Sequence, residues 1–191
     1  MTGFEPFGNY SVNPSGELAK ALNGTVVDGA LVIGVVLPVN FTTAVEQAKA
    51  AITRYAPVLV ISTGLNARLH RVTVEHVAVD LHQQPRVDGR WVPPTRLDPS
   101  GPLVRRASIP VERCVLSLCA GGVPVRGSWW AGTYVCNAVF YEEVGCVQGS
   151  GVRVGFVHVP LLDSQDPNGL PLSVLVTALQ RVIETSLAQC S

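Results

Sequence analysis

Apolar residues gather in short runs along the chain, and segments with helical spacing lie between these runs. The run at 30–39 is continuous, as is typical of a strand that is covered on both faces of a sheet. Similar runs at 58–62 and 152–159 predict two more strands, and 123–128 predicts a shorter one. Segment 72–81 alternates between apolar and polar positions, which predicts one strand with two distinct faces.

The helical segments come with recognisable start and stop signals. Asn13 can cap a helix whose first turn contains Pro14. Thr43 and Glu46 are spaced as a capping box, and Pro57 would end the helix that they begin. We expect helices over 13–22, 42–56 and 109–120, one beginning near Gly132, and a last one over 171–190.

Strands that alternate with helices predict an α/β fold, a three-layer α/β/α sandwich around a largely parallel (mixed) twisted sheet. The chain has 191 residues and is 47% hydrophobic, so it can bury a proper core, and we expect a single domain over 1–191. The formal net charge is zero and no basic run occurs, which argues against a nucleic-acid partner. No apolar stretch approaches the roughly 20 residues of a membrane helix, and the opening MTGFEPFG lacks the parts of a secretory signal.

Cysteine and histidine spacing argues against disulfides and metal. The five cysteines are odd in number and form no CxxC pair, so we expect a reducing cytoplasm. His70, His76 and His82 recur every six residues, and six strand residues span about 20 Å, too far for two of them to hold one ion. Phosphate-binding and dinucleotide-binding loops are missing from the sequence. We therefore predict neither a metal nor a cofactor.

Two residues suit nucleophilic chemistry. Cys136 lies in the first turn of the helix that follows the strand at 123–128, and the positive end of a helix favours a thiolate. His158 lies near the end of the strand at 152–159, and in α/β sheets sites gather at the carboxyl ends of strands. A thiol and an imidazole on one rim of the sheet can act as nucleophile and general base.

A third group would orient the imidazole. Glu75 is the candidate, because it shares a strand face with apolar residues and a buried carboxylate needs a partner. Each residue also has a structural interpretation. Cys136 can be a small buried hydrophobe, His158 a hydrogen-bonded core histidine, and Glu75 an exposed residue on an edge strand.

The motifs around these residues resemble one family. TGFEPFGNYSVNPS at 2–15, VTVEHVAVDL at 72–81, AGTYVCNAVFY at 131–141 and VGFVHVPLL at 154–162 resemble pyroglutamyl peptidase type I in order and spacing. The resemblance implies a cytosolic thiol protease, an omega-peptidase that removes N-terminal pyroglutamate from peptides. It also implies the α/β/α sandwich and a homo-oligomer, commonly a tetramer.

The resemblance assigns roles to residues of this sequence. The family's nucleophile, general base and acidic residue correspond to Cys136, His158 and Glu75, the residues that the physical argument selects. Pyroglutamate is a flat uncharged lactam, whose pocket needs apolar walls and a few hydrogen-bonding groups. By resemblance, the substrate-binding residues are Phe4, Phe7, Asn13, Tyr134 and Val135, with Asn13 bracing the loop.

Departures from the family pattern leave alternatives open. Family members have an apolar strand ahead of TGF, whereas only Met1 and Thr2 precede Gly3 here, so the sheet could lack a strand. Leu65 takes the place of a family glutamine, and the substrate loop at 82–90 has no clear counterpart. The alternatives are a cysteine amidase of altered specificity and a non-catalytic binding protein on the same scaffold.

Overall fold

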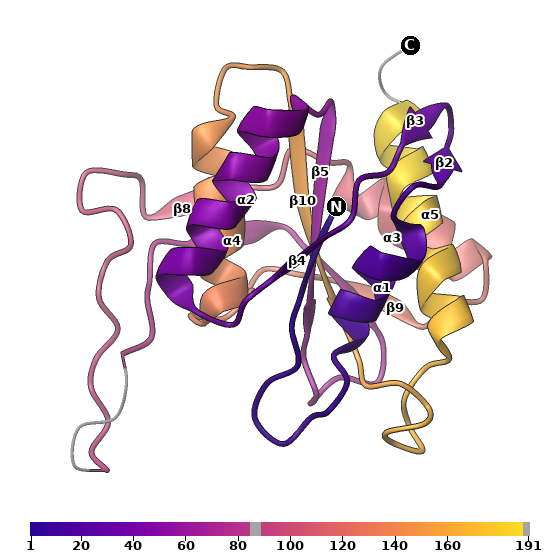
Figure 1. Ribbon diagram of the computed structural model, residues 1–191, viewed down its shortest axis with the longest axis horizontal. Helices are drawn as coiled ribbons and strands as arrows, with labels where there is room; N and C mark the ends of the chain where they lie inside the picture. The colour runs from indigo at the N-terminus through magenta and orange to yellow at the C-terminus, as the bar shows by residue number, and fades with distance from the viewer. Residues whose placement is uncertain (85–88, 189–191) are drawn as a thin grey trace.

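A mixed sheet of six strands forms the centre of the molecule, in the order β4-β1-β5-β10-β6-β9 (Figure 1). The computed structural model describes residues 1–84 and 89–188. The strands of this sheet are β1 (Thr2–Phe4), β4 (Val35–Leu37), β5 (Leu59–Leu65), β6 (Val72–Glu75), β9 (Val125–Ser128) and β10 (Arg153–Val159). Strands β4, β1, β5 and β10 are parallel, while β6 is antiparallel to β10 and β9 is parallel to β6.

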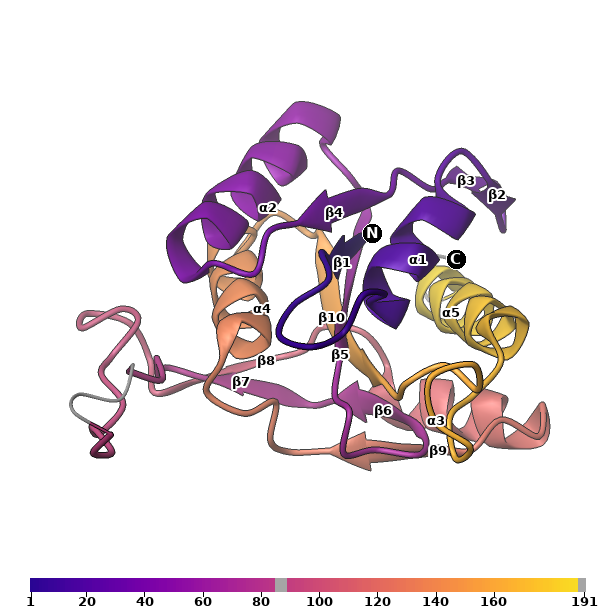
Figure 2. The ribbon, with the colours of Figure 1, turned by 60° about the horizontal axis from the view of Figure 1, so that its bottom comes forward.

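Helices cover both faces of the sheet (Figure 2). One face carries α1 (Pro14–Leu22), α3 (Val111–Ala120) and α5 (Leu172–Leu187), and the other carries α2 (Phe41–Tyr55) and α4 (Val135–Cys146). Strand β10 serves both layers, because Val157 and Val159 face the first and Val154 and Phe156 face the second. The expected three-layer α/β/α fold is confirmed.

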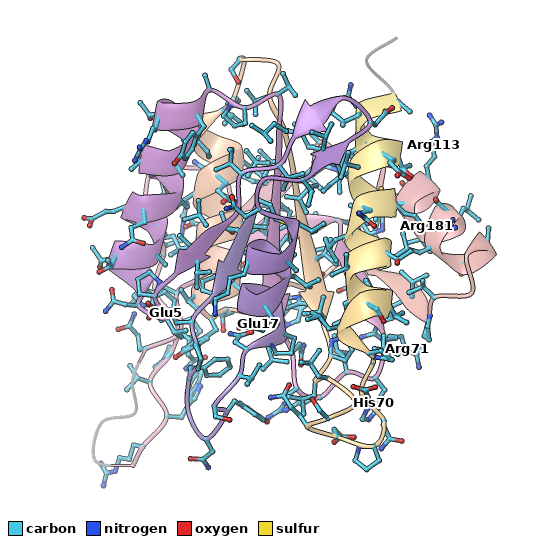
Figure 3. The ribbon with its side chains drawn as sticks, turned by 45° about the vertical axis from the view of Figure 1, so that its right-hand side comes forward. Glu5, Glu17, His70, Arg71, Arg113 and Arg181 are labelled. Carbon is cyan, nitrogen blue, oxygen red and sulfur yellow. The ribbon has the colours of Figure 1, made fainter. Side chains whose placement is uncertain are left out.

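Side chains also join neighbouring helices within a layer. Arg181 of α5 reaches α3, where its guanidinium donates a hydrogen bond of 3.3 Å to the carbonyl of Ser117 (Figure 3). Within residues 1–84 and 89–188, no helix combines the length and hydrophobicity needed to cross a membrane.

The first strand of the sheet is present. Strand β1 lies between β4 and β5, with Thr2 paired to both Val35 and Ser62. The conjecture that the sheet lacks this strand is therefore wrong. Three residues suffice because they continue the parallel pairing that their neighbours define.

The apolar run at 30–39 does not form one strand, contrary to the prediction. Its first part, β3 (Ala30–Leu31), forms a hairpin with β2 (Val26–Val27), and only β4 belongs to the main sheet. The break falls at Gly34, where a Cβ would lie 1.9 Å from the backbone oxygen of Ala19. Helix α1 passes so close at this point that the chain needs a glycine, and hydrophobicity alone does not show this.

Segment 72–81 also divides, and the division matters for the site. Strand β6 ends at Glu75, and β7 (Val77–Val79) pairs with β8 (Val104–Arg106) in a separate two-stranded sheet. His76 is the turning point, because its N–H donates to Ser128 and its carbonyl accepts from Ala107. The alternating face predicted for Glu75 therefore does not continue beyond it.

One of the two predicted helix caps is present, and the other helix begins at a different capping residue. Asn13 caps α1 as predicted, its side-chain oxygen accepting from the N–H of Ser15 at 3.1 Å. Helix α2 begins at Phe41, and Asn40 caps it by accepting from the N–H of Thr43 at 3.1 Å. The capping box predicted for Thr43 and Glu46 is thus replaced by an earlier cap.

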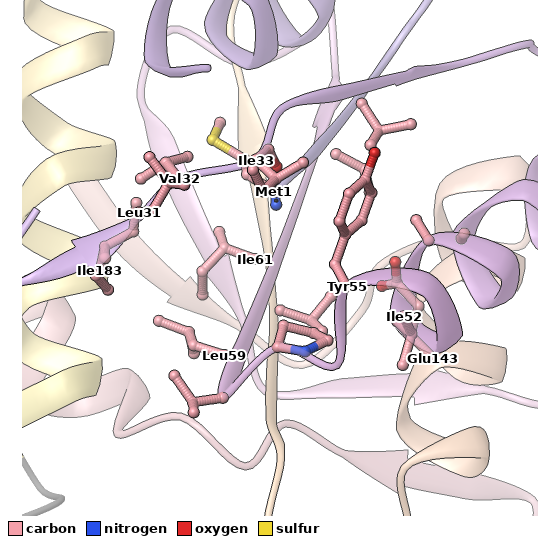
Figure 4. A pocket seen from close by; sticks show the side chains of 18 of the residues that line it. Met1, Leu31, Val32, Ile33, Ile52, Tyr55, Leu59, Ile61, Glu143 and Ile183 are labelled. Atoms are coloured by element: carbon pink, nitrogen blue, oxygen red, sulfur yellow. Dashed lines mark hydrogen bonds between the residues drawn. The ribbon is translucent and has the colours of Figure 1, made fainter. Parts of the chain in front are cut away.

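A cavity of about 150 Å³ lies away from these helix starts, beside the amino-terminal half of β5 (Figure 4). Leu59 and Ile61 line it from the sheet, and Glu143 of α4 brings in a fully buried carboxyl group. The Ser62 hydroxyl lies 2.7 and 2.8 Å from the two oxygens of this carboxyl group. Burial raises the pKa of Glu143 to about 7, although the hydrogen bond from Ser62 and the α-amino group of Met1 oppose the shift.

Candidate active site

Cys136 lies in the first turn of α4, where that helix meets the carboxyl ends of β5 and β10. Its sulfur is next to Gly64, and Gly64 pairs with His158 in the sheet. The strand at 123–128 does not lead directly to this rim, contrary to the prediction, because β9 is antiparallel to β10. Segment 129–134 instead carries the chain from the end of β9 to the start of α4 (Figure 2).

His158 and Glu75 form a buried pair. His158 Nδ1 lies 2.8 Å from Glu75 Oε1, and the two residues are 5% and 1% exposed. Burial alone would lower the pKa of His158, but hydrogen bonds with Cys136 and Glu75 and the charges of both partners raise it to about 9. Because Nδ1 faces Glu75, Nε2 is the ring nitrogen left for the thiol of Cys136.

Gly64 provides the space that the sulfur of Cys136 occupies. A Cβ built at this position would lie 2.7 Å from Cys136 Sγ and 3.0 Å from Phe156 Cζ, far inside normal contact. Any larger residue would therefore push the sulfur away from His158.

We expect Gly64→Ala to lower kcat/KM by about 100-fold, since an error of about 1 Å in a reacting group can cost that much. Initial rates would measure the effect, and the melting temperature would show whether the sheet stays folded. A folded variant with the activity of the native chain would contradict this role for Gly64.

The start of α4 offers backbone donors for a developing oxyanion. No side chain caps this helix, and its first internal hydrogen bond runs from Ala138 N to Tyr134 O at 3.1 Å. The leading N–H groups, including that of Cys136, are therefore available to a negative oxygen. The N–H groups of Leu81, His82 and Gln83 are not available in this way, because they all donate to backbone carbonyls.

The residues of the first motif separate into core and loop. Phe4 is 2% exposed and packs in the core beneath α2 and α4. Phe7 is half-buried, with its ring edge-on to Tyr10 at 5.9 Å between centroids. Asn13 braces the loop between them and α1, because its amide donates to the carbonyl of Glu5 at 2.9 Å.

The two residues before Cys136 face different surroundings. Val135 is 2% exposed, whereas Tyr134 is 49% exposed and its ring meets Phe41 edge-on, with 5.3 Å between centroids. Phe41 in turn packs against His82, with 3.9 Å between ring centroids. These three rings, Tyr134, Phe41 and His82, form an aromatic wall beside Cys136.

Sequence reasoning missed Gly64 and Phe41 as parts of the site. The signal for Gly64 was its place at the carboxyl end of a buried strand, the rim on which sites gather. Phe41 gave no local signal, because only the fold brings the start of α2 beside Tyr134. Leu65 is buried at the end of β5, and residues 85–88 of the predicted substrate loop lie outside the described residues.

Comparisons with known proteins agree on one family. The family model described as pyroglutamyl peptidase matches residues 1–189. The pyrrolidone-carboxylate peptidase of Klebsiella pneumoniae (strain 342) is 36% identical over 193 residues, covering 98% of this chain and 90% of that protein. The enzyme of the same name from Bacillus subtilis (strain 168) is 32% identical over 197 residues, covering 99% and 91%.

Solved structures give the same result. Pyrrolidone carboxyl peptidase from Thermococcus litoralis superposes with a TM-score of 0.92 at 30% identity, covering 99% of this chain and 92% of that one. Pyroglutamyl peptidase I from Bacillus amyloliquefaciens gives a TM-score of 0.90 at 28% identity, covering 98% and 95%.

Proposed function

The chain belongs to the pyroglutamyl peptidase family of cysteine peptidases, which remove N-terminal pyroglutamate, and we propose that Cys136, His158 and Glu75 carry out this reaction. The observation that carries the proposal is the buried pair of His158 and Glu75, 2.8 Å apart, with the thiol on the other side of the imidazole. This arrangement matches the roles of nucleophile, base and orienting acid.

The reaction proceeds in two steps. The sulfur of Cys136 attacks the carbonyl carbon of pyroglutamate, and a C–S bond forms while the C–N bond to the next residue breaks. His158 gives its proton to the departing amine. Water then attacks the thioester, the imidazole takes a proton from it, and the C–S bond breaks to release free pyroglutamate. Glu75 holds the imidazole in position and stabilises its positive charge throughout.

The lactam pocket would be formed by residues on two segments. Phe7 and Tyr134 supply exposed aromatic surface, while Phe4 and Val135 support the pocket from the core. Asn13 acts indirectly, because its hydrogen bond to Glu5 fixes the loop that presents Phe7. A mainly apolar pocket with few polar groups suits an uncharged lactam.

An affinity label tests the proposal. We expect a chloromethyl ketone that carries the pyroglutamyl group to alkylate Cys136 alone, leaving exposed Cys119 and Cys146 unmodified. Peptide mass mapping locates the adduct. The matched reagent with a cyclopentyl ring lacks the ring amide and should react at least about tenfold more slowly, a difference of about 1.4 kcal/mol. Labelling mainly at another cysteine would contradict the assignment of the nucleophile.

The same pair of reagents tests the alternative of altered specificity. Equal rates for the two rings would favour a broader cysteine amidase, the possibility raised by Leu65. The alternative of a non-catalytic binding protein was raised because the sheet could lack its first strand. That reason no longer holds, because β1 is present in the sheet.

We further propose a single domain over 1–191, a cytoplasmic location and a homo-oligomer, a tetramer by family resemblance. Cys114, Cys119, Cys136 and Cys146 are unpaired thiols, which suits a reducing compartment. Trp129 and Trp130 are 57% and 58% exposed, and aromatic surface of this kind is common at subunit contacts.

A further inference from the structure

Asn137, the residue after the nucleophile, makes hydrogen bonds that the catalytic roles do not require. Its side chain is fully buried in the first turn of α4. The amide oxygen accepts from the N–H of Val79 at 2.8 Å. The amide nitrogen donates to the carbonyls of Val79 at 2.8 Å and Leu81 at 3.0 Å. One side chain thus satisfies three backbone groups at the end of β7.

A second tie joins the same two parts of the chain. The N–H of Gln83 donates to the carbonyl of Thr133 at 2.7 Å, and the Thr133 hydroxyl lies 3.3 Å from Gln83 Oε1. Segment 79–83 is therefore held to segment 133–137 at both of its ends. His82 lies inside this segment and is also paired with Thr95, so the ties and this pairing together place its ring.

The ring of His82 completes the aromatic wall beside Cys136. It packs on Phe41, which meets Tyr134 edge-on. Phe41 comes from α2 and Tyr134 from the start of α4, so the wall is assembled from three separate segments. Its geometry depends on whatever fixes segment 79–83 relative to α4.

We propose that Asn137 is a positioning residue for substrate binding, which holds segment 79–83 against α4 and so keeps the ring of His82 in the aromatic wall. The inference rests on the proposed function, since it assigns the wall to the lactam site. Asn137 acts on the affinity for the substrate, while the thiol and imidazole keep their own geometry. Its removal should therefore raise KM and leave kcat nearly unchanged.

Steady-state kinetics on a pyroglutamyl aminocoumarin amide test this inference. Asn137→Ala should raise KM about tenfold and change kcat less than about threefold. Alkylation of Cys136 by iodoacetamide should keep its pH profile, because the side chain of Asn137 bonds to Val79 and Leu81 rather than to Cys136 or His158. A fall in kcat at constant KM, or a shifted alkylation profile, would overturn the proposal.

A double-mutant cycle tests whether Asn137 acts through the ring of His82, and His82→Ala alone tests the wall if Asn137→Ala destabilises the fold. His82→Ala removes the ring without disturbing buried hydrogen bonds, and it should raise KM by a similar factor. In the His82→Ala background, Asn137→Ala should add less than about twofold to KM, because residues that act through one another are not additive. Additive effects would mean that Asn137 does not act through the wall.

Hydrogen exchange supplies a readout that does not depend on activity. In Asn137→Ala the N–H groups of Val79 and Gln83 should lose protection, whereas those of β10 should keep theirs. Unchanged protection at Gln83 would refute the tie even if the chain proved inactive on lactam substrates. Asn23→Ala is the matched control, because its amide oxygen also accepts a backbone N–H, from Gly34 at 2.9 Å, far from the site. It should leave KM unchanged.

Discussion

Cys136→Ala should lower kcat on a pyroglutamyl aminocoumarin amide by at least about 10⁴-fold, because no thioester can form without the sulfur. The remaining groups would still bind the substrate, so KM should change much less than kcat. Single-turnover fluorescence with enzyme in excess measures rates this low.

Cys119→Ala provides the control, since Cys119 is an exposed thiol on α3. It should retain the full activity of the native chain, and both variants should unfold at a similar temperature. Activity that survives in Cys136→Ala and disappears in Cys119→Ala would refute the proposed active site.

Glu75→Gln should lower kcat by about 10²- to 10⁴-fold while the thiol stays in place. An amide has the shape of the carboxylate but lacks its charge, so it no longer stabilises the imidazolium of His158. The pKa of His158, about 9 in the native chain, should fall as this partner is lost.

The same substitution should also change how the free energy of unfolding depends on pH. A histidine whose folded pKa lies above its unfolded value stabilises the fold below about pH 6.5, and this contribution disappears as the pH rises through about 9. In urea unfolding, the difference in free energy of unfolding between the native chain and Glu75→Gln should therefore be larger at pH 6.5 than at pH 10. A difference in free energy of unfolding that increases with pH would contradict the pairing of His158 with Glu75.

Glu112→Gln is the matched control for Glu75→Gln. Glu112 Oε1 lies 3.7 Å from Nδ1 of His76, but this carboxylate is on the surface of α3. An exposed pair of this kind contributes little, so activity and its dependence on pH should both be preserved.

Sequence patterns predicted elements well where local signals and tertiary contacts agree. Helix α1 with its Asn13 cap, helix α3, and strands β5 and β10 lie where periodicity placed them. The residues expected at the active site meet because β5 and β10 end on the same rim and α4 starts there. Alternation of strands and helices predicted the α/β arrangement, but not how the chain reaches this rim from β9.

The prediction failed where distant parts of the chain decide local structure. The run at 30–39 divides because α1 approaches Gly34, and segment 72–81 divides because His76 bonds to residues about 30 and 50 positions away. The direction of β9 is set by its pairing with β6, and the hydrophobic pattern of the sequence does not indicate this pairing. The hydrogen bonds of Asn137 could not be predicted either, because they depend on β7 lying beside the first turn of α4.

The buried carboxyl group of Glu143 makes the stability of the fold depend on pH below neutrality. Its folded pKa, about 7, lies above the usual value of 4.5, so the native chain holds this proton more tightly than the unfolded chain. The contribution of Glu143 to the free energy of unfolding therefore decreases between about pH 4.5 and 7, by on the order of 3 kcal/mol. The contribution of His158 also falls, as the pH rises to about 9, so two buried groups near opposite ends of α4 together favour mildly acidic storage.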